Sequence, residues 1–256
     1  MPKRLAIRLR SKSFLRTLKA VQLPLLLAAL FAASLHLAAQ SQPASRFVVV
    51  LDAAHGGDDS GGALTDSSGA ATLEKTYTLA LSVRLRSLLA ARGIAVVTTR
   101  ESDTTLDPAK RAEIANRVNA AACLTLHASE SGASGVHLYT SSLTPADPAR
   151  LVPWKTAQAA WVTRSLALAG VLNSALEHAG ISVILGRTAL PVIDSMTCPA
   201  VAVEIAPQLA SAQTQPAALD DSDYQSRVAQ ALAAAILQWK SAATRTGNPP
   251  AEVIQP

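Results

Sequence analysis

Residues 47–62, FVVVLDAAHGGDDSGG, decide the fold of this chain. They begin as an unbroken Val/Leu run and pass into a turn that carries Asp52, His55 and a pair of glycines. Such a run predicts a strand buried on both faces, as in a parallel sheet covered by helices. Polar groups just past the carboxyl end of such a strand lie where open α/β sheets bind ligands. On this stretch alone, His55 fits a binding site and a plain βα turn equally well.

The segments that follow extend the α/β pattern. Residues 74–92 place apolar side chains at helical spacing before Gly93, which predicts a helix beginning at Glu74. Further strands are predicted at residues 94–99, 122–126, 135–140 (an edge strand) and 200–203, with two short extended pieces in 181–193 on either side of Gly186-Arg187. Further helices are predicted at residues 107–120, 155–178 and 222–240. The fold class expected is α/β, a single three-layer domain over residues 47–240 with a mostly parallel twisted sheet and helices on both faces.

The net charge of +5 is concentrated at the amino terminus. The first 40 residues contain seven Lys and Arg and no acidic residue, so the remainder carries about −2. A nearly neutral domain excludes nucleic acid as the expected partner.

These positive charges precede an apolar run at residues 21–39, followed by a polar linker at residues 40–46. The pattern predicts that residues 1–39 are a signal peptide or an amino-terminal anchor in the inner membrane. Both alternatives export the domain to the periplasm or cell envelope. Residues 241–256 are expected to be a disordered tail.

The chain contains two cysteines, Cys123 and Cys198, each near the start of a predicted core strand. Export makes a disulfide conceivable, but the sequence does not give the distance between them. Two buried free thiols are the preferred interpretation.

Four residues able to bind a metal or transfer a proton occupy equivalent positions in this pattern. His55, His127 and Glu204 follow strands, and Glu74 opens a helix. Because parallel strands share one carboxyl edge, these side chains are expected to converge. Two imidazoles and one carboxylate, with a position left for water, are typical of catalytic zinc, and the other carboxylate suits a general base. The pattern alone does not say which glutamate is the ligand and which is the base.

Six motifs occur in order along the chain. They are VVLDAAHGG (49–57), EKTYTLALS (74–82), TRESD with its downstream Arg and Ala-Asn (99–116), TLHAS (125–129), GVHLY (135–139) and PAVAVE (199–204). Through them the chain resembles the zinc-dependent N-acetylmuramoyl-L-alanine amidases of bacterial cell-wall turnover, the amidase type 3 family. It departs from the family pattern at the Ala53-Ala54 pair, which stands where Pro-Gly is usual, and after Glu204. The loop at residues 141–153 is too short for the inhibitory helix of some relatives, so an open cleft is expected.

The resemblance implies a role for each candidate residue. His55, Glu74 and His127 would bind one Zn²⁺, and Glu204 would be the catalytic carboxylate. The implied substrate is peptidoglycan, cut at the amide between N-acetylmuramic acid and L-alanine during cell-wall turnover and daughter-cell separation.

Other interpretations are weaker. A serine hydrolase using His55-Gly56-Gly57 would need a G-x-S-x-G elbow, and the chain has none. A catalytically silent peptidoglycan-binding derivative would be favoured by the loss of a ligand, but all four residues are present. His137 and His178 are expected to be structural, and Asp52 either orients a metal-bound histidine or caps the turn.

Overall fold

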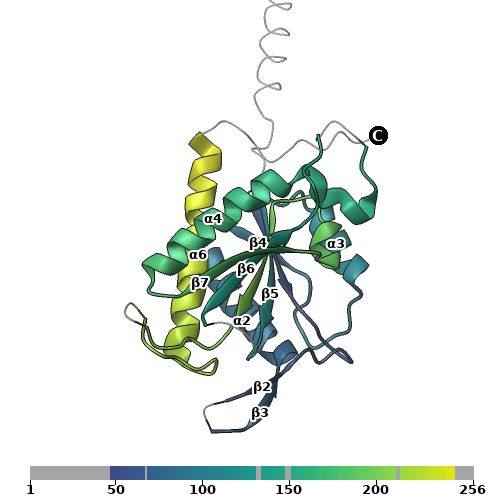
Figure 1. Cartoon of the computed structure of the whole chain (residues 1–256). Coiled ribbons are helices and arrows are strands. Elements are labelled where there is room, and N and C mark those ends of the chain that lie inside the picture. The colour runs from purple at the N-terminus through teal and green to yellow at the C-terminus, as the bar shows by residue number, and fades with distance from the viewer. Residues whose placement is uncertain (1–46, 67, 131–133, 148–150, 212–213, 246–256) are drawn as a thin grey trace, which may run out of the picture. The chain divides into compact units, whose positions relative to one another are not determined.

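The computed structural model describes residues 47–66, 68–130, 134–147, 151–211 and 214–245. Their helices and strands alternate along much of the chain (Figure 1). The strands are β1 (Val48–Ala53), β2 (Ala63–Thr65), β3 (Ala71–Leu73), β4 (Ala95–Thr98), β5 (Ala122–Ala128), β6 (Val136–Ser141), β7 (Val183–Thr188) and β8 (Ala200–Ile205). The helices are α2 (Glu74–Ala90), α3 (Pro108–Arg117), the 3₁₀ helix η1 (Trp154–Ala160), α4 (Val162–His178), α5 (Pro191–Asp194) and α6 (Ser222–Arg245).

Six strands form the central sheet, in the order β4-β1-β5-β8-β6-β7. The first four strands in this order are parallel to one another, β6 is antiparallel to β8, and β7 is parallel to β6. The predicted α/β class with a mostly parallel sheet is therefore confirmed. Three interior strands, β1, β5 and β8, are buried along almost their whole length because helices cover both faces.

The two faces of the sheet are covered unequally. Helices α2, α4 and α6 pack on one face, where Leu85, Leu172 and Ile236 are fully buried in a continuous apolar core. The other face carries the shorter α3 and α5, and its core is smaller, with Ala112 and Ile193 as typical members. At the carboxyl edge of the parallel strands, this thinner layer leaves room for a site.

Several predicted elements differ in detail. The strand at residues 135–140 is not an edge strand, because β7 continues through the expected break at Gly186 and pairs beside it. The single helix predicted at 155–178 is a 3₁₀ helix followed by α4, with a non-helical Thr156. Between the turn at His55 and α2, where no strand was predicted, the chain forms the β2–β3 hairpin. Residues 241–245 continue α6, so the tail predicted from residue 241 is helical there; the rest of it lies outside the described residues.

The two cysteines form a disulfide, so the prediction of two free thiols is wrong. Cys123 at the start of β5 is bonded to Cys198 just ahead of β8, with their Cα atoms 6.2 Å apart. Both residues are buried in the smaller core. Adjacent parallel strands bring their amino ends together, and this places the two thiols within bonding distance although 75 positions separate them.

The predicted signal or anchor at residues 1–39, its apolar run at 21–39 and the linker at 40–46 lie outside the described residues. In the part of the chain that the structure describes, no helix combines the length and apolarity needed to cross a membrane.

Candidate metal centre and active site

His55 lies in the turn that follows β1, and two buried arginines hold that turn. Arg111 donates to the carbonyls of Ala53 (2.7 Å) and His55 (2.6 Å). Arg100 donates to the carbonyls of Ala53 (2.9 Å) and Ala54 (3.0 Å). His55 itself has a φ of 63°, which is uncommon for a residue other than glycine and is maintained here by these bonds.

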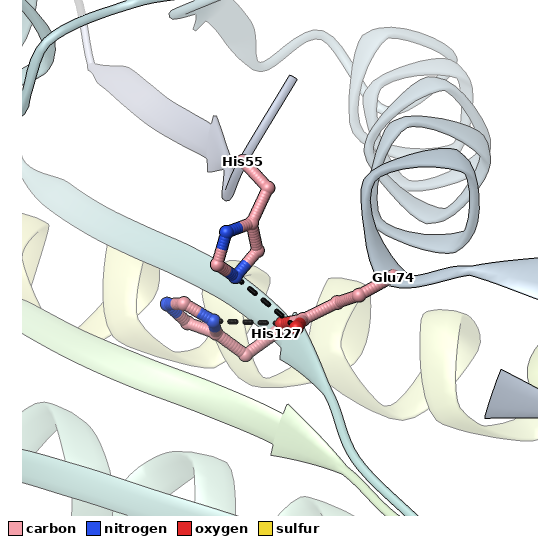
Figure 2. A group of neighbouring side chains, drawn as sticks. All are labelled: His55, Glu74 and His127. Atoms are coloured by element: carbon pink, nitrogen blue, oxygen red, sulfur yellow. Dashed lines mark hydrogen bonds and ion pairs between the residues drawn. The ribbon is translucent and has the colours of Figure 1, made fainter. Parts of the chain in front are cut away.

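Glu74 is the first residue of α2 and is almost fully buried. The carboxylate accepts hydrogen bonds from the backbone amides of Gly62 (2.8 Å) and Ala128 (3.2 Å). It also faces both histidines: Oε2 lies 3.1 Å from Nε2 of His55, and Oε1 lies 2.9 Å from Nδ1 of His127. Figure 2 shows the two imidazoles converging on this carboxylate from separate elements.

Three side chains, those of His55, Glu74 and His127, offer a compact set of possible metal ligands, and we call them the metal group. Donor atoms of His55, Glu74 and His127 all lie within 4.8 Å of one another. The imidazole rings are nearly perpendicular, with centroids 5.3 Å apart. Two neutral imidazole nitrogens and one carboxylate oxygen match the donors that catalytic zinc uses in proteins, so the residues fit such an ion.

The electrostatics of the group favour an ionised carboxylate. Burial opposes the charge on Glu74, but hydrogen bonds with His127, His55 and two amides outweigh it and hold the pKa of Glu74 well below its usual range. The hydrogen bond to Glu74 in turn raises the pKa of His55 despite its partial burial, and Asp59 adds to this effect. The carboxylate is therefore ready to bind a cation at neutral pH.

A neighbouring acid fixes the orientation of His55. Both carboxylate oxygens of Asp59 lie 2.9 Å from Nδ1 of His55, which leaves Nε2 facing Glu74. A carboxylate on the second ring nitrogen selects the tautomer and orients a metal-binding histidine. Asp52, considered for this role from the sequence, instead accepts hydrogen bonds from Thr99 (2.7 Å) and Arg111 (2.8 Å).

Asp59 was missed because it is one of two adjacent acids in a Gly-rich turn. Its spacing of four residues from His55 was the available signal, but the turn conformation that brings the two side chains together depends on Gly56 and Gly57, both at positive φ.

The fourth candidate, Glu204, stands beside this group. In the register of the sheet, Glu204 on β8 is the Cα partner of His127 on β5 and of His137 on β6. Paired residues project to the same face of a sheet, so Glu204 lies next to His127. Glu204 is not one of the three residues whose donor atoms cluster within 4.8 Å. The structure thus brings together all four residues singled out in the sequence. His137 is buried in the sheet, and His178 ends α4.

Tyr139 lies near the charge of Glu204. Burial raises the pKa of the Tyr139 hydroxyl, and the negative charge of Glu204 adds to the shift. The Tyr139 ring also lies against Gly186 of β7, where a Cβ would come within 2.7 Å of it. The Tyr139 ring is therefore packed against β7, near enough to Glu204 to feel its charge.

Two cavities meet at His127. One, of about 340 Å³, is polar and holds the candidate base. Its lining is Gly62, Ala63, Leu64, Glu74, His127, Ala128, Ser129, Glu130 and Glu204. The other, of about 350 Å³, extends under His55 toward α3 and α5 and is largely apolar. The arrangement can hold a metal ion at the junction of two binding spaces, with a carboxylate positioned in one of them.

Solved structures with the same fold include N-acetylmuramoyl-L-alanine amidases. The catalytic domain of CwlV, an N-acetylmuramoyl-L-alanine amidase from Paenibacillus polymyxa var. colistinus, is 29% identical, with a TM-score of 0.58 over 76% of this chain and 98% of that one. The amidase AmiC2 of Nostoc punctiforme is 25% identical, with a TM-score of 0.55 over 76% of this chain and 97% of that one.

A curated relative matches over a shorter stretch. The germination-specific N-acetylmuramoyl-L-alanine amidase of Bacillus subtilis (strain 168) is 46% identical over 68 residues, which are 27% of this chain and 27% of that protein. The chain therefore matches about a quarter of the length of this relative.

The family comparison covers most of the domain. The Amidase_3 profile, described as N-acetylmuramoyl-L-alanine amidase, matches residues 49–238, from β1 to the penultimate turns of α6. This span includes every element that contributes to the metal group and to the cavities around it. The chain belongs to the N-acetylmuramoyl-L-alanine amidase family, Amidase_3.

Proposed function

We propose that this protein is a zinc-dependent N-acetylmuramoyl-L-alanine amidase that cuts peptidoglycan between N-acetylmuramic acid and L-alanine. The observation that carries the proposal is the convergence of His55, Glu74 and His127 within 4.8 Å, beside a cavity that contains Glu204. Family membership supports the same reaction. The catalytic domain would span residues 47–240.

His55, Glu74 and His127 would hold the zinc ion. When bound there, zinc acts as a Lewis acid that polarises the amide carbonyl and makes water a better nucleophile. Asp59 keeps His55 in the tautomer that this binding needs. Glu74 remains ionised through its four hydrogen-bonding neighbours, so no proton has to leave it.

Glu204 would act as the proton carrier of the hydrolysis. Its carboxylate accepts a proton as water adds to the carbonyl carbon, and it returns the proton to the nitrogen of L-alanine as the C–N bond breaks. The products are the muramoyl carboxylate and a free peptide amine. Glu204 is only partly buried and lines the polar cavity together with Ala63 and Leu64 of β2, so water can reach the carboxylate.

The disulfide supports an extracytoplasmic location. Structural disulfides persist in oxidising compartments such as the bacterial periplasm and are rare in the cytosol. The Cys123–Cys198 bond therefore agrees with export of the domain to the periplasm or cell envelope by residues 1–39, whether these are cleaved or remain as an anchor. The physiological role we propose is cell-wall turnover, including separation of daughter cells.

Metal analysis and one pair of variants test the proposal. The purified protein is expected to contain about one zinc per chain and to release stem peptides from peptidoglycan. Glu204→Gln should keep the zinc and lose about 10²- to 10⁴-fold in kcat, the usual contribution of a general base. Glu130→Gln is the matched control, because Glu130 lines the same cavity and bonds the backbone amide of Thr65.

Two results would contradict the proposal. A protein that binds no zinc would remove the metal mechanism. Equal losses in the Glu204 and Glu130 variants would show that the cavity tolerates no change, and that Glu204 has no special role. Retention of peptidoglycan by the wild type without release of peptide would instead identify a silent binding derivative.

A further inference from the structure

A separate hollow beside α3 plays no part in the proposed reaction. Its volume is about 420 Å³, within the range of small-molecule sites in proteins. One wall is α3, which contributes Ala112, Glu113, Asn116 and Arg117, and the other carries Trp154 at the start of η1. We call this space the α3 groove. It opens to solvent, because the side chains of Arg117 and Trp154 are both more than half exposed.

The ring of Trp154 gives the α3 groove a flat apolar surface. A lone exposed apolar side chain is common in soluble proteins and needs no explanation. Trp154 differs because it stands beside a floor of small apolar residues, Ala109 and Ala112, which leaves room against the ring. Nζ of Lys155 lies 5.5 Å from the centroid of the ring, but Lys155 does not line the groove. A flat aromatic surface is therefore available to a ligand.

Both walls of the α3 groove are fixed to the turn between α5 and β8. The side-chain amide of Asn116 donates to the carbonyl of Ser195 (2.9 Å) and accepts from the backbone amide of Thr197 (2.7 Å). From η1, the buried Gln158 donates to the carbonyl of Cys198 (3.0 Å). The disulfide joins Cys198 in turn to β5. The groove is thus formed before a ligand binds, which lowers the conformational entropy lost on binding.

The charged side chains that line the α3 groove, among the described residues, are Glu113 and Arg117. They form an ion pair with each other, and their side chains are 43% and 65% exposed. The two charges cancel, so the groove selects neither an anion nor a cation by its overall charge. The pair still offers carboxylate acceptors and guanidinium donors at the edge of the groove.

These features specify a neutral ligand that has one apolar face and a polar rim. A pyranose ring meets both conditions, because its C–H groups can stack on the indole of Trp154 while its hydroxyls bond to Glu113 and Arg117. An extended peptide fits less well, since it needs partners for its own amides and carbonyls. The side-chain amide of Asn116, which could have served a peptide, is already bonded to the turn.

The α3 groove begins next to the candidate active site. Pro108, the first residue of α3, lines the largely apolar cavity that His55 and His127 also line, and the next residue, Ala109, lines the groove. From Ala109 the groove follows the helix to Arg117, a distance of about 12 Å at the usual helical rise. A polymer held at the metal group can therefore extend into it.

We propose that the α3 groove binds a sugar ring of the glycan strand, at a distance from the amide that is cut, with Trp154 as the stacking surface. This inference rests on the proposed function, because the glycan strand is the part of peptidoglycan that continues beyond the cleaved muramoyl residue. Such a site holds long strands and makes no contact with a substrate that has a single sugar. The enzyme then prefers the polymer over short fragments.

The first test compares two substrates, peptidoglycan and the single-sugar compound N-acetylmuramoyl-L-alanyl-D-isoglutamine. Trp154→Ala should lower kcat/KM on peptidoglycan at least about fivefold, as truncation of an aromatic anchor does at other interfaces, and change it less than about twofold on the small substrate. Trp154→Phe keeps an aromatic face and should restore most of the rate on the polymer. Leu151→Ala is the matched control, because Leu151 is fully exposed in the same segment but does not line the groove.

The second test measures binding without catalysis. The probe is a glycan oligosaccharide of N-acetylglucosamine and N-acetylmuramic acid without stem peptides, titrated into the full chain by calorimetry. Arg117→Ala should weaken its binding about threefold or more, the value of a hydrogen bond to a charged group at an exposed site. Lys110→Ala should not, since Lys110 also pairs with Glu113 but does not line the groove.

Three results would overturn the inference. One is a wild-type protein that does not bind the peptide-free oligosaccharide. Another is an equal loss in the Trp154 and Leu151 variants. The third is capture of the wild type by phosphatidylglycerol vesicles that both of these variants abolish, which would make the segment a membrane contact. Failure of the proposed function looks different, because then neither substrate is cut, while calorimetry still shows whether the groove binds glycan.

Discussion

The two faces of the sheet differ in what their buried residues do. On the face of α2, α4 and α6, the core is continuous and consists mainly of aliphatic side chains packed against one another. On the face of α3 and α5, the core is small, and beside it lie the two cavities and the carboxylate of Glu204. One face carries the larger core, and the other carries the smaller core and the largely apolar cavity.

The second face compensates for its thin layer with specific bonds. The disulfide joins the amino ends of β5 and β8, and the salt bridge between Arg111 and Asp52 fixes α3 to β1. The disulfide holds the strands that carry His127 and Glu204, and the salt bridge holds the strand that leads to His55. Changes on the two faces should therefore have separable effects on stability and on activity.

The largest stability change is expected from the disulfide. Replacing both Cys123 and Cys198 by alanine opens a loop of 75 residues in the unfolded chain and should lower the free energy of unfolding by about 4 kcal/mol. Denaturant unfolding of the variant, beside wild type with and without reductant, measures this. Wild type under reductant should approach the variant. An unchanged unfolding midpoint would show that the smaller core is stable without the bond.

A core truncation on the opposite face comes next. Leu172 of α4 is fully buried in the large core, and Leu172→Ala should lower the free energy of unfolding by about 3 kcal/mol. Because Leu172 lines neither cavity, kcat of the folded fraction should not change. A loss of kcat at a temperature where the variant is fully folded would show that changes in the larger core also affect activity, and that the two faces are not independent.

Asp59→Asn should weaken the metal site with little effect on folding. The change removes the charge that orients His55 while keeping a similar shape, and zinc affinity should fall about 10- to 100-fold. Competition with a chromophoric chelator gives the affinity. Asp58→Asn is the control, since the adjacent Asp58 is exposed and makes no bond to His55 through its side chain. Similar losses in both variants would mean that the overall negative charge of the turn matters, and the orientation of His55 does not.

The smallest effect is expected at Ser82 of α2, on the face of the sheet with the larger core. Its buried hydroxyl in α2 has no partner, so Ser82→Ala should raise the free energy of unfolding by up to about 1 kcal/mol, helped by the helix propensity of alanine. Thermal unfolding measures the change, and activity should stay constant. A destabilised Ser82→Ala protein would show that this hydroxyl has a partner, such as an internal water.

Sequence patterns predicted the parts of the fold that depend on local apolar periodicity. The strand before His55 and the helix that begins at Glu74 were identified because a buried run and a helical repeat are both visible over short windows. The convergence of the four site residues followed from the shared carboxyl edge of parallel strands. Their catalytic and metal-binding roles remain proposals.

Features that depend on tertiary contacts were missed. The Cys123–Cys198 bond requires knowing that β5 and β8 are neighbours, which two cysteines 75 positions apart do not reveal. The β2–β3 hairpin has strands of three residues, too short for an alternating pattern. The strand β7 was divided at Gly186 because glycine usually weakens a strand, whereas here it leaves room for the ring of Tyr139.

Two glycines of the loop between β1 and α2 show how unevenly this turn tolerates substitution. Gly69, at a φ of +84°, has nothing within 4 Å of where a Cβ would be, so asparagine or aspartate can replace it at a modest conformational cost. Gly61, at +66°, would place a Cβ 2.7 Å from both Oε2 of Glu74 and Cδ2 of His55. In a saturation library, position 61 should therefore accept glycine alone, because the side chains of Glu74 and His55 pack against the backbone with no space for another side chain.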